Sequence, residues 1–218
     1  GERAEHLLNW MLDIYEKEKD EAFKPSQLTF SAVINAWAKC KHFDKAIRAR
    51  AVLDKMIEMY ESGNSDAKPN TIVYTAVLNA CAYTIGDSSA KLESFQMATD
   101  AFKELCRSRY GNPNHVTYGT FLTACRNLVP EGDSRASTVK AVFNKCCLDG
   151  QVSDLVMKRA QSALTNEQFE SLLEGHDFII NVDGTVDMES IPDKWKANAV
   201  DVRRGRKQPM PYKTGQRP

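Results

Sequence analysis

The residues best suited to acid–base, metal or nucleophilic chemistry are scattered along this chain without a recognisable spacing. The four histidines, none of which forms a pair at metal-ligand spacing, are His6, His42, His115 and His176. The stretch Asp183-x-Thr185-x-Asp187 lacks the glycine and glutamate spacing of a calcium loop. No dinucleotide-binding, phosphate-binding, zinc-protease or serine-hydrolase motif occurs. We therefore predict no enzymatic activity, no metal site and no cofactor.

The cysteines also lack the spacing of a metal site or a disulfide framework. The six, which contain no C-x-x-C pair, are Cys40, Cys81, Cys106, Cys125, Cys146 and Cys147. Most of them fall on apolar helical faces, which predicts buried free thiols in a reducing compartment.

The composition is that of a globular protein with an uneven distribution of charge. The chain has 218 residues, is 42% apolar, and carries 29 basic and 29 acidic residues. This excludes disorder of the whole chain, and the absence of a long apolar run predicts no contact with a membrane. The stretch 193–218 has a net charge of +6, leaving −6 on the rest. A zero net charge argues against a strongly basic nucleic-acid binder.

An internal repeat supplies the elements that must position any site. Three segments align, each beginning at a proline: Pro25, Pro69 and Pro113, which are 44 residues apart. The aromatic residues Phe30, Tyr74 and Tyr118 recur at the same spacing, and so do Ile34, Leu78 and Leu122. Each unit contains two stretches with helical periodicity, separated by polar loops. Such helix pairs bury their apolar faces only by stacking, which predicts an all-α, right-handed α-solenoid with an irregular C-terminal tail.

The repeat also predicts the domain boundaries. We expect a helical repeat domain over 1–174, consisting of a partial repeat 1–26, repeats 27–70, 71–114 and 115–153, and a terminal half-repeat 154–174. An irregular extension with a basic tail follows over 175–218, including a docking segment from Ile191 to Trp195 and a short extended stretch from Phe178 to Asp187. The chain begins at Gly1 inside an expected helix, so we expect a fragment with further repeats and any targeting segment upstream.

At these repeats the chain resembles the pentatricopeptide-repeat family of helical RNA-binding proteins. The resemblance rests on Lys24-Pro25 before Leu28-Thr29-Phe30-Ser31, Lys68-Pro69-Asn70 before Ile72-Val73-Tyr74-Thr75, and Pro113-Asn114 before Val116-Thr117-Tyr118-Gly119. A weaker fourth match spans 149–154, and the resemblance covers roughly 2–165. The 44-residue unit exceeds the usual short repeat, which is typical of an expanded, algal or diatom-like organellar type.

The resemblance implies single-stranded RNA as the partner, one base being recognised by two or three side chains of each repeat. The implied base-contacting pairs are Ser31 with Asn70, Thr75 with Asn114, and Gly119 with Ser153. The implied aliphatic wedges between neighbouring bases are Leu28, Ile72 and Val116. A hydroxyl paired with asparagine resembles the family's adenine-preferring combination, so two adjacent adenines are the hypothesis. Gly119 has no side chain to donate, which weakens the third pair.

Each of these residues also has a purely structural interpretation. Asn70, Asn114 and Ser153 are good helix N-caps without any RNA. The three aliphatic residues are equally compatible with a core position, and the repeated aromatic residues are better explained by packing within a repeat than by base stacking. The basic cluster from Arg203 to Lys207 either grips phosphates or keeps a terminus soluble.

The functional alternative is a protein-binding scaffold of the tetratricopeptide-like helical class. The acidic body of the chain favours it, because phosphate neutralisation supplies much of the affinity for RNA. Against it, a local basic stripe is expected from Lys39, Lys41, Lys45, Arg48 and Arg126. The family resemblance implies a mitochondrion or plastid, an organellar transcript and a role in RNA processing or expression. Other protein factors are possible partners; a small-molecule substrate is not expected.

Overall fold

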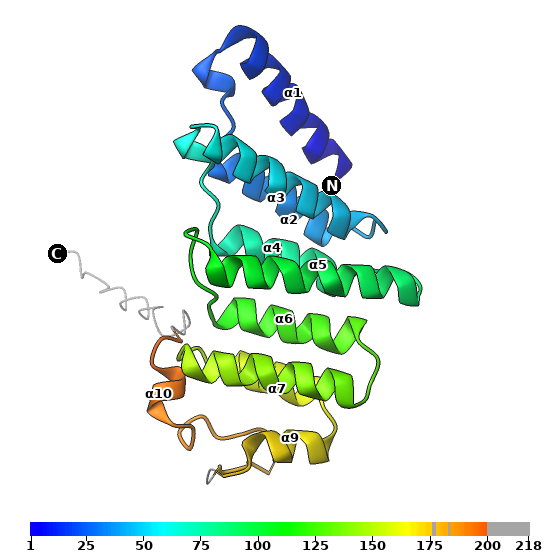
Figure 1. Ribbon diagram of the computed structural model, residues 1–218, viewed down its shortest axis with the longest axis vertical. Helices are drawn as coiled ribbons and strands as arrows, with labels where there is room; N and C mark the ends of the chain where they lie inside the picture. The colour runs from blue at the N-terminus through cyan, green and yellow to red at the C-terminus, as the bar shows by residue number, and fades with distance from the viewer. Residues whose placement is uncertain (176–177, 183, 200–218) are drawn as a thin grey trace, which may run out of the picture.

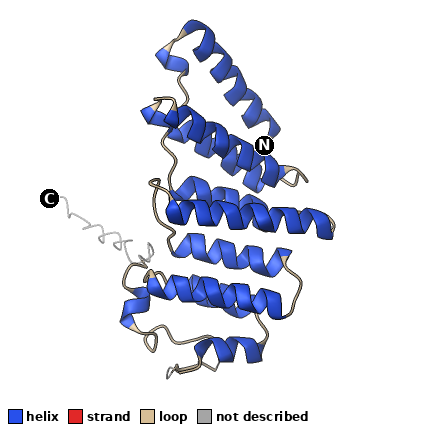
Figure 2. Cartoon of the chain, viewed as in Figure 1, coloured by secondary structure: helices blue, strands red, loops and turns tan. Residues whose placement is uncertain are grey.

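The computed structural model describes residues 1–175, 178–182 and 184–199, and within them helix is the dominant element (Figures 1 and 2). The helices are α1 (Glu2–Glu18), α2 (Gln27–Lys39), α3 (Lys45–Glu61), α4 (Thr71–Ala82), α5 (Ser88–Arg107), α6 (His115–Leu128), α7 (Asp133–Leu148), α8 (Asp154–Ala163), α9 (Asn166–Leu173) and α10 (Asp193–Lys196), with 3-10 turns η1 (Glu21–Phe23) and η2 (Ser65–Ala67). The all-α prediction is confirmed for this part of the chain.

We call the first helix of each repeat, α2, α4 and α6, the inner helix. Where an inner helix starts follows from the residues that precede it. The Asn70 Oδ1 accepts a hydrogen bond from the Val73 N–H at 3.0 Å, and Asn114 Oδ1 accepts one from the Thr117 N–H at 2.9 Å. Both asparagines are therefore N-caps, and each satisfies a backbone donor that the helix leaves free. The prolines at 69 and 113 stand directly before these caps, where the chain is still extended.

The helices pack as a succession of pairs, and one member of each pair forms a continuous row. The pairs are α2 with α3, α4 with α5, and α6 with α7, and the row consists of α2, α4, α6 and α8. Figure 1 shows the elements following one another in chain order along the long axis, from α1 at one end to α9 at the other. We call the contacts α2–α4, α4–α6 and α6–α8 the first, middle and last junctions.

A repeated side-chain to backbone hydrogen bond connects the repeats at the first and middle junctions. The Gln27 Nε2 donates to the Lys68 carbonyl at 2.7 Å, and the Thr71 Oγ1 donates to the Asn112 carbonyl at 3.0 Å. Donors and acceptors are each 44 positions apart, so the sequence repeat is also a contact repeat. The first residue of each inner helix thus determines where the next repeat begins.

The repeated aromatic residues lie inside the pairs. Phe30, Tyr74 and Tyr118 have no exposed surface, as expected for packing within a repeat rather than base stacking. The Tyr74 hydroxyl donates to Glu104 on α5 at 2.6 Å, and the Tyr118 hydroxyl donates to Asp149 beyond α7. Burial and these carboxylates raise the pKa of both tyrosines far above the ordinary value.

The segment after α9 packs against α7 and the loop that follows it. The Trp195 ring meets Phe143 of α7 edge-on, with 6.0 Å between ring centroids, and the Trp195 carbonyl accepts from the Val152 N–H at 2.8 Å. The predicted docking of 191–195 is therefore confirmed. The expected extended stretch is reduced to one antiparallel bridge between Ile180 and Val186, and Asp183 lies outside the described residues.

Two further expectations concern the whole chain. All six cysteines are free; four are buried, and Cys40 and Cys106 are half-buried. Over the described residues, no helix is both long and apolar enough to cross a membrane. The basic cluster 203–207 lies outside the described residues.

Candidate functional site

The three predicted wedge residues form an exposed aliphatic row along the inner helices. Leu28, Ile72 and Val116 lie in the first turns of α2, α4 and α6, with 79%, 65% and 41% of their surface exposed. A core position is therefore excluded for all three. Apolar side chains exposed at one equivalent position of successive repeats are available to a ligand that runs along the row.

The structure brings four of the predicted residues together in one pocket at the middle junction, which we call the middle pocket. Ile72 and Thr75 come from α4, Val116 comes from α6, and Asn114 caps α6. The pocket has a volume of about 340 Å³ and is open to solvent. This size is near the lower end of the range for small-molecule pockets, so the space suits one planar group rather than a large ligand.

The polar groups of the middle pocket are already partly engaged with one another. The Thr75 hydroxyl lies 2.7 Å from the Thr71 carbonyl and 2.8 Å from the Thr117 hydroxyl. The Thr117 hydroxyl is also 3.0 Å from Asn114 Oδ1. The Asn114 Nδ2 makes no hydrogen bond within the described part of the chain, so it is available to a ligand.

The first junction places its predicted pair in an equivalent but simpler setting. Ser31 is half-buried, and its hydroxyl has no hydrogen-bond partner among the described residues. Asn70 keeps its Nδ2 free, as Asn114 does, because its Oδ1 caps α4. Val73 occupies the position equivalent to Thr117 and carries no hydroxyl.

The last junction does not offer its predicted pair to a ligand in the same way. Gly119 is buried, and a Cβ built on it would lie 3.1 Å from Leu155 Cγ on α8. Ser153 caps α8, its Oγ accepting from the Val156 N–H at 3.4 Å. The pair therefore lacks both a side chain on α6 and an open space above it.

Several residues of the site were not predicted. Asn35, Asn79 and Thr120 also line the middle pocket, and the two asparagines are 44 positions apart, a signal that the repeat contained. Leu155 is the fourth member of the aliphatic series, and its alignment with Val116 follows from the match at 149–154. No sequence pattern could have identified Thr117, because its hydrogen bond to Thr75 depends on how α4 and α6 pack against each other.

The expected basic stripe is wrong at Lys45, and an ion pair engages a second member, Arg48. Lys45 has only 4% of its surface exposed, and burial lowers the pKa of its ammonium group. The Arg48 guanidinium is 3.4 Å from the carboxylate of Glu5 on α1, which neutralises it locally. No lysine or arginine lines the middle pocket.

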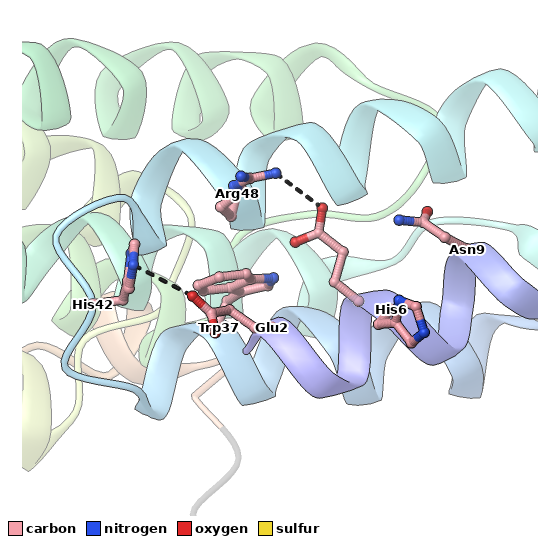
Figure 3. A pocket seen from close by; sticks show the side chains of 7 residues that line it. Glu2, His6, Asn9, Trp37, His42 and Arg48 are labelled. Atoms are coloured by element: carbon pink, nitrogen blue, oxygen red, sulfur yellow. Dashed lines mark hydrogen bonds and ion pairs between the residues drawn. The ribbon is translucent and has the colours of Figure 1, made fainter.

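A second pocket lies away from this row, at the end of the stack occupied by α1 (Figure 3). The ring of Trp37 lies between two contacts in that view: the ion pair of Arg48 with Glu5, and the approach of His42 Nε2 to the Glu2 carboxylate at 3.6 Å. The Trp37 indole N–H is buried and has no acceptor among the described groups. Cys81 and Cys125 replace Trp37 in the next repeats, so this pocket is not a repeated feature.

The described residues provide little for catalysis or metal binding. No group of three or more histidine, cysteine or acidic side chains is arranged to hold a metal ion within the described ranges. Burial raises the pKa of Cys81 and Cys125 to about 12, so neither is a thiolate nucleophile at neutral pH.

A pentatricopeptide repeat-containing protein of Arabidopsis thaliana is similar to this chain, with 29% identity over 149 aligned residues. The similarity covers 53% of this chain and 23% of the relative, so the chain spans about a quarter of that protein's length. No family model and no solved structure matches the chain. The similarity agrees with the helical repeats found in the fold.

Proposed function

We propose that the chain binds single-stranded RNA sequence-selectively, through modular repeats of a right-handed α-solenoid. The observation that carries this proposal is the middle pocket, where Ile72, Thr75, Asn114 and Val116 meet although they come from two repeats. The similarity to a pentatricopeptide repeat-containing protein supports the same function.

The pocket has the features that a single base requires. Ile72 and Val116 contribute exposed apolar surface to the lining, against which the faces of a base can pack. In the same lining, the free Asn114 Nδ2 offers donors and the Thr75 hydroxyl offers an acceptor, which are the groups needed on a base edge. Ser31 and Asn70 repeat this pair one unit earlier, so two adjacent adenines remain the proposed target.

The remaining predictions follow from this function as proposals. Residues 1–174 would form the repeat domain and 175–218 the extension, acting without catalysis in organellar RNA processing or expression. The RNA would be a mitochondrial or plastid transcript. The third predicted pair, Gly119 with Ser153, would contribute least, because Leu155 covers Gly119.

A protein-binding scaffold is the second candidate, and one observation favours it. The middle pocket contains no cation, and two members of the expected basic stripe are buried or paired. Phosphate neutralisation near the pocket would therefore be weak, whereas RNA binding usually depends on it.

The deciding experiment combines Thr75→Ala with Asn114→Ala and measures binding of fluorescein-labelled oligo(A) and oligo(U) by anisotropy at two salt concentrations. We expect oligo(A) affinity to fall by roughly tenfold or more, because a bidentate base contact contributes about 1–3 kcal/mol. Thr165→Ala is the matched control, since it removes the N-cap of α9 at a cost of about 1 kcal/mol of stability without touching the pocket or any predicted base contact. RNA binding that survives the double substitution would show that Thr75 and Asn114 are not the base contacts, and binding that ignores both base and salt would favour the scaffold.

A further inference from the structure

A chain of hydrogen bonds beneath the middle pocket connects the two residues that contact the base in the proposed function. It runs from the Thr71 carbonyl to the Thr75 hydroxyl at 2.7 Å, on to the Thr117 hydroxyl at 2.8 Å, and from there to Asn114 Oδ1 at 3.0 Å. Thr117 has no exposed surface, so it reaches a ligand only through Thr75 and Asn114.

The protons available to this chain determine what the pocket presents. Each hydroxyl has one proton, and the Thr75 proton has two acceptors within reach, the Thr71 carbonyl and the Thr117 oxygen. In either arrangement the proton is directed away from the pocket. Thr75 therefore offers a ligand only its lone pairs.

The same network fixes the orientation of the Asn114 amide. The Thr117 N–H, which is only a donor, lies 2.9 Å from Asn114 Oδ1. The amide oxygen must therefore point toward Thr117, and Nδ2 remains the group that a ligand meets. The middle junction presents one acceptor and one donor in fixed places.

The first junction lacks this constraint. Ser31 occupies the position of Thr75, and Val73 occupies the position of Thr117, so no neighbouring hydroxyl holds the serine. The Gln27 carbonyl is four residues before Ser31, as the Thr71 carbonyl is before Thr75, yet the Ser31 hydroxyl makes no hydrogen bond among the described residues. The hydroxyl of the neighbouring helix is therefore what distinguishes the held Thr75 from the free Ser31. The Asn70 amide is oriented in the same way as that of Asn114, by the Val73 N–H at 3.0 Å. The two junctions differ in whether the hydroxyl on the inner helix is free to rotate and donate.

We infer that Thr117 is a positioning residue that sets how strictly the middle junction discriminates between bases, and this inference rests on the proposed RNA binding. The Watson–Crick edges of adenine and cytosine place an amino donor beside a ring acceptor, whereas guanine and uracil place a carbonyl acceptor beside a ring donor. In a given pose, a fixed acceptor and donor accept one pattern and reject the other. A hydroxyl that rotates can also donate to a carbonyl, so the Ser31 position rejects guanine and uracil through the fixed Asn70 amide alone and is the more permissive one.

The test removes the buried hydroxyl from the middle junction and introduces one at the first junction. Thr117→Val removes the buried hydroxyl with little change of shape, and Val73→Thr introduces one at the equivalent place beside Ser31. Anisotropy titrations use 10-nucleotide RNAs with two central adenines in a uridine background, each adenine being replaced in turn by guanine, cytosine and uracil. The RNA position of the middle junction is the one whose base preference disappears in Asn114→Ala.

We expect the wild-type protein to prefer adenine over guanine or uracil about tenfold at that position, and Thr117→Val to reduce the preference to about threefold or less. Thr117→Ser, which keeps the hydroxyl, should retain the wild-type preference, and Val73→Thr should sharpen the preference at the other position.

A purely structural role for Thr117 would change affinity for every RNA equally and leave the base ratios unchanged. Unchanged ratios in both variants, with RNA still bound and the helical circular dichroism intact, would overturn the inference alone. If the wild-type protein binds none of these RNAs, the proposed function is overturned and the inference with it.

Discussion

The middle and last junctions come from equivalent stretches of sequence, yet only the middle one is open to a ligand. At the middle junction a threonine and an asparagine border a pocket of about 340 Å³. At the last junction Gly119 replaces the threonine, and Leu155 of α8 lies against it. The comparison shows that a repeated position becomes a binding position only if the neighbouring helix leaves space above it.

The largest expected effect comes from forcing a side chain into the last junction. Gly119→Leu should lower the free energy of unfolding by about 1–3 kcal/mol, because the new atoms would overlap Leu155, whose Cγ is already 3.1 Å from a built Cβ. The matched change at the equivalent position of the first junction, Ser31→Leu, should cost less than about 0.5 kcal/mol. Urea denaturation of both variants measures the difference, and equal losses would show that the last junction is not closed.

A smaller effect tests whether the helix pairs α4–α5 and α6–α7, beside the two junctions, behave alike. Tyr74→Phe and Tyr118→Phe each remove a buried hydroxyl that donates to a carboxylate, and each should cost about 1.5 kcal/mol. The carboxylates keep a cationic partner, since Arg50 is 2.8 Å from Glu104 and Lys145 is 3.1 Å from Asp149. Thermal or urea unfolding should give similar losses for the two variants. A loss in only one would mean that the pairs α4–α5 and α6–α7 are not equivalent.

The smallest effect is a loss of stability at alkaline pH. Burial raises the pKa of Cys81 and of Cys125 from 9.0 to about 12, so between these values the folded state holds protons that the unfolded state has released. This contribution is fully present below pH 9 and is lost as the pH rises, by at most about 1.4 kcal/mol per pH unit for each thiol. Urea unfolding at pH 8, 9 and 10 measures the slope. Cys81→Ala and Cys125→Ala should each make the slope shallower by a similar amount, and an unchanged slope in either variant would contradict the assignment to that thiol.

Much of the fold could be predicted because it depends on neighbouring residues in the chain. The proline at 69 or 113 followed by asparagine marks where an inner helix begins, and the hydrogen bonds of Asn70 and Asn114 bear this out. Helical periodicity indicates a second helix in each repeat, but it does not indicate that α5 begins as early as Ser88. The first turn of α5 is polar and capped by Asp87, so it contributes no apolar pattern.

The candidate site could be predicted only in part. The repeat identified Leu28, Ile72 and Val116 as equivalent, and their shared exposure agrees with that. The expected basic stripe included Lys45 as a surface cation, which is wrong because Lys45 is buried near Cys40, Cys81 and Tyr83 at the ends of α2 and α4. Burial of a long side chain depends on the distance between helices, which the spacing of residues along one helix does not contain.

By itself, then, the order of residues determined that each repeat forms two helices, where α4 and α6 begin and which positions recur every 44 residues. Only the tertiary structure decided that Thr75 faces Thr117, that Leu155 covers Gly119 and that the middle pocket remains open. The physical reason is that helix formation and capping are satisfied within a few residues, whereas a pocket or a buried hydrogen bond requires atoms from two helices that packing has brought together.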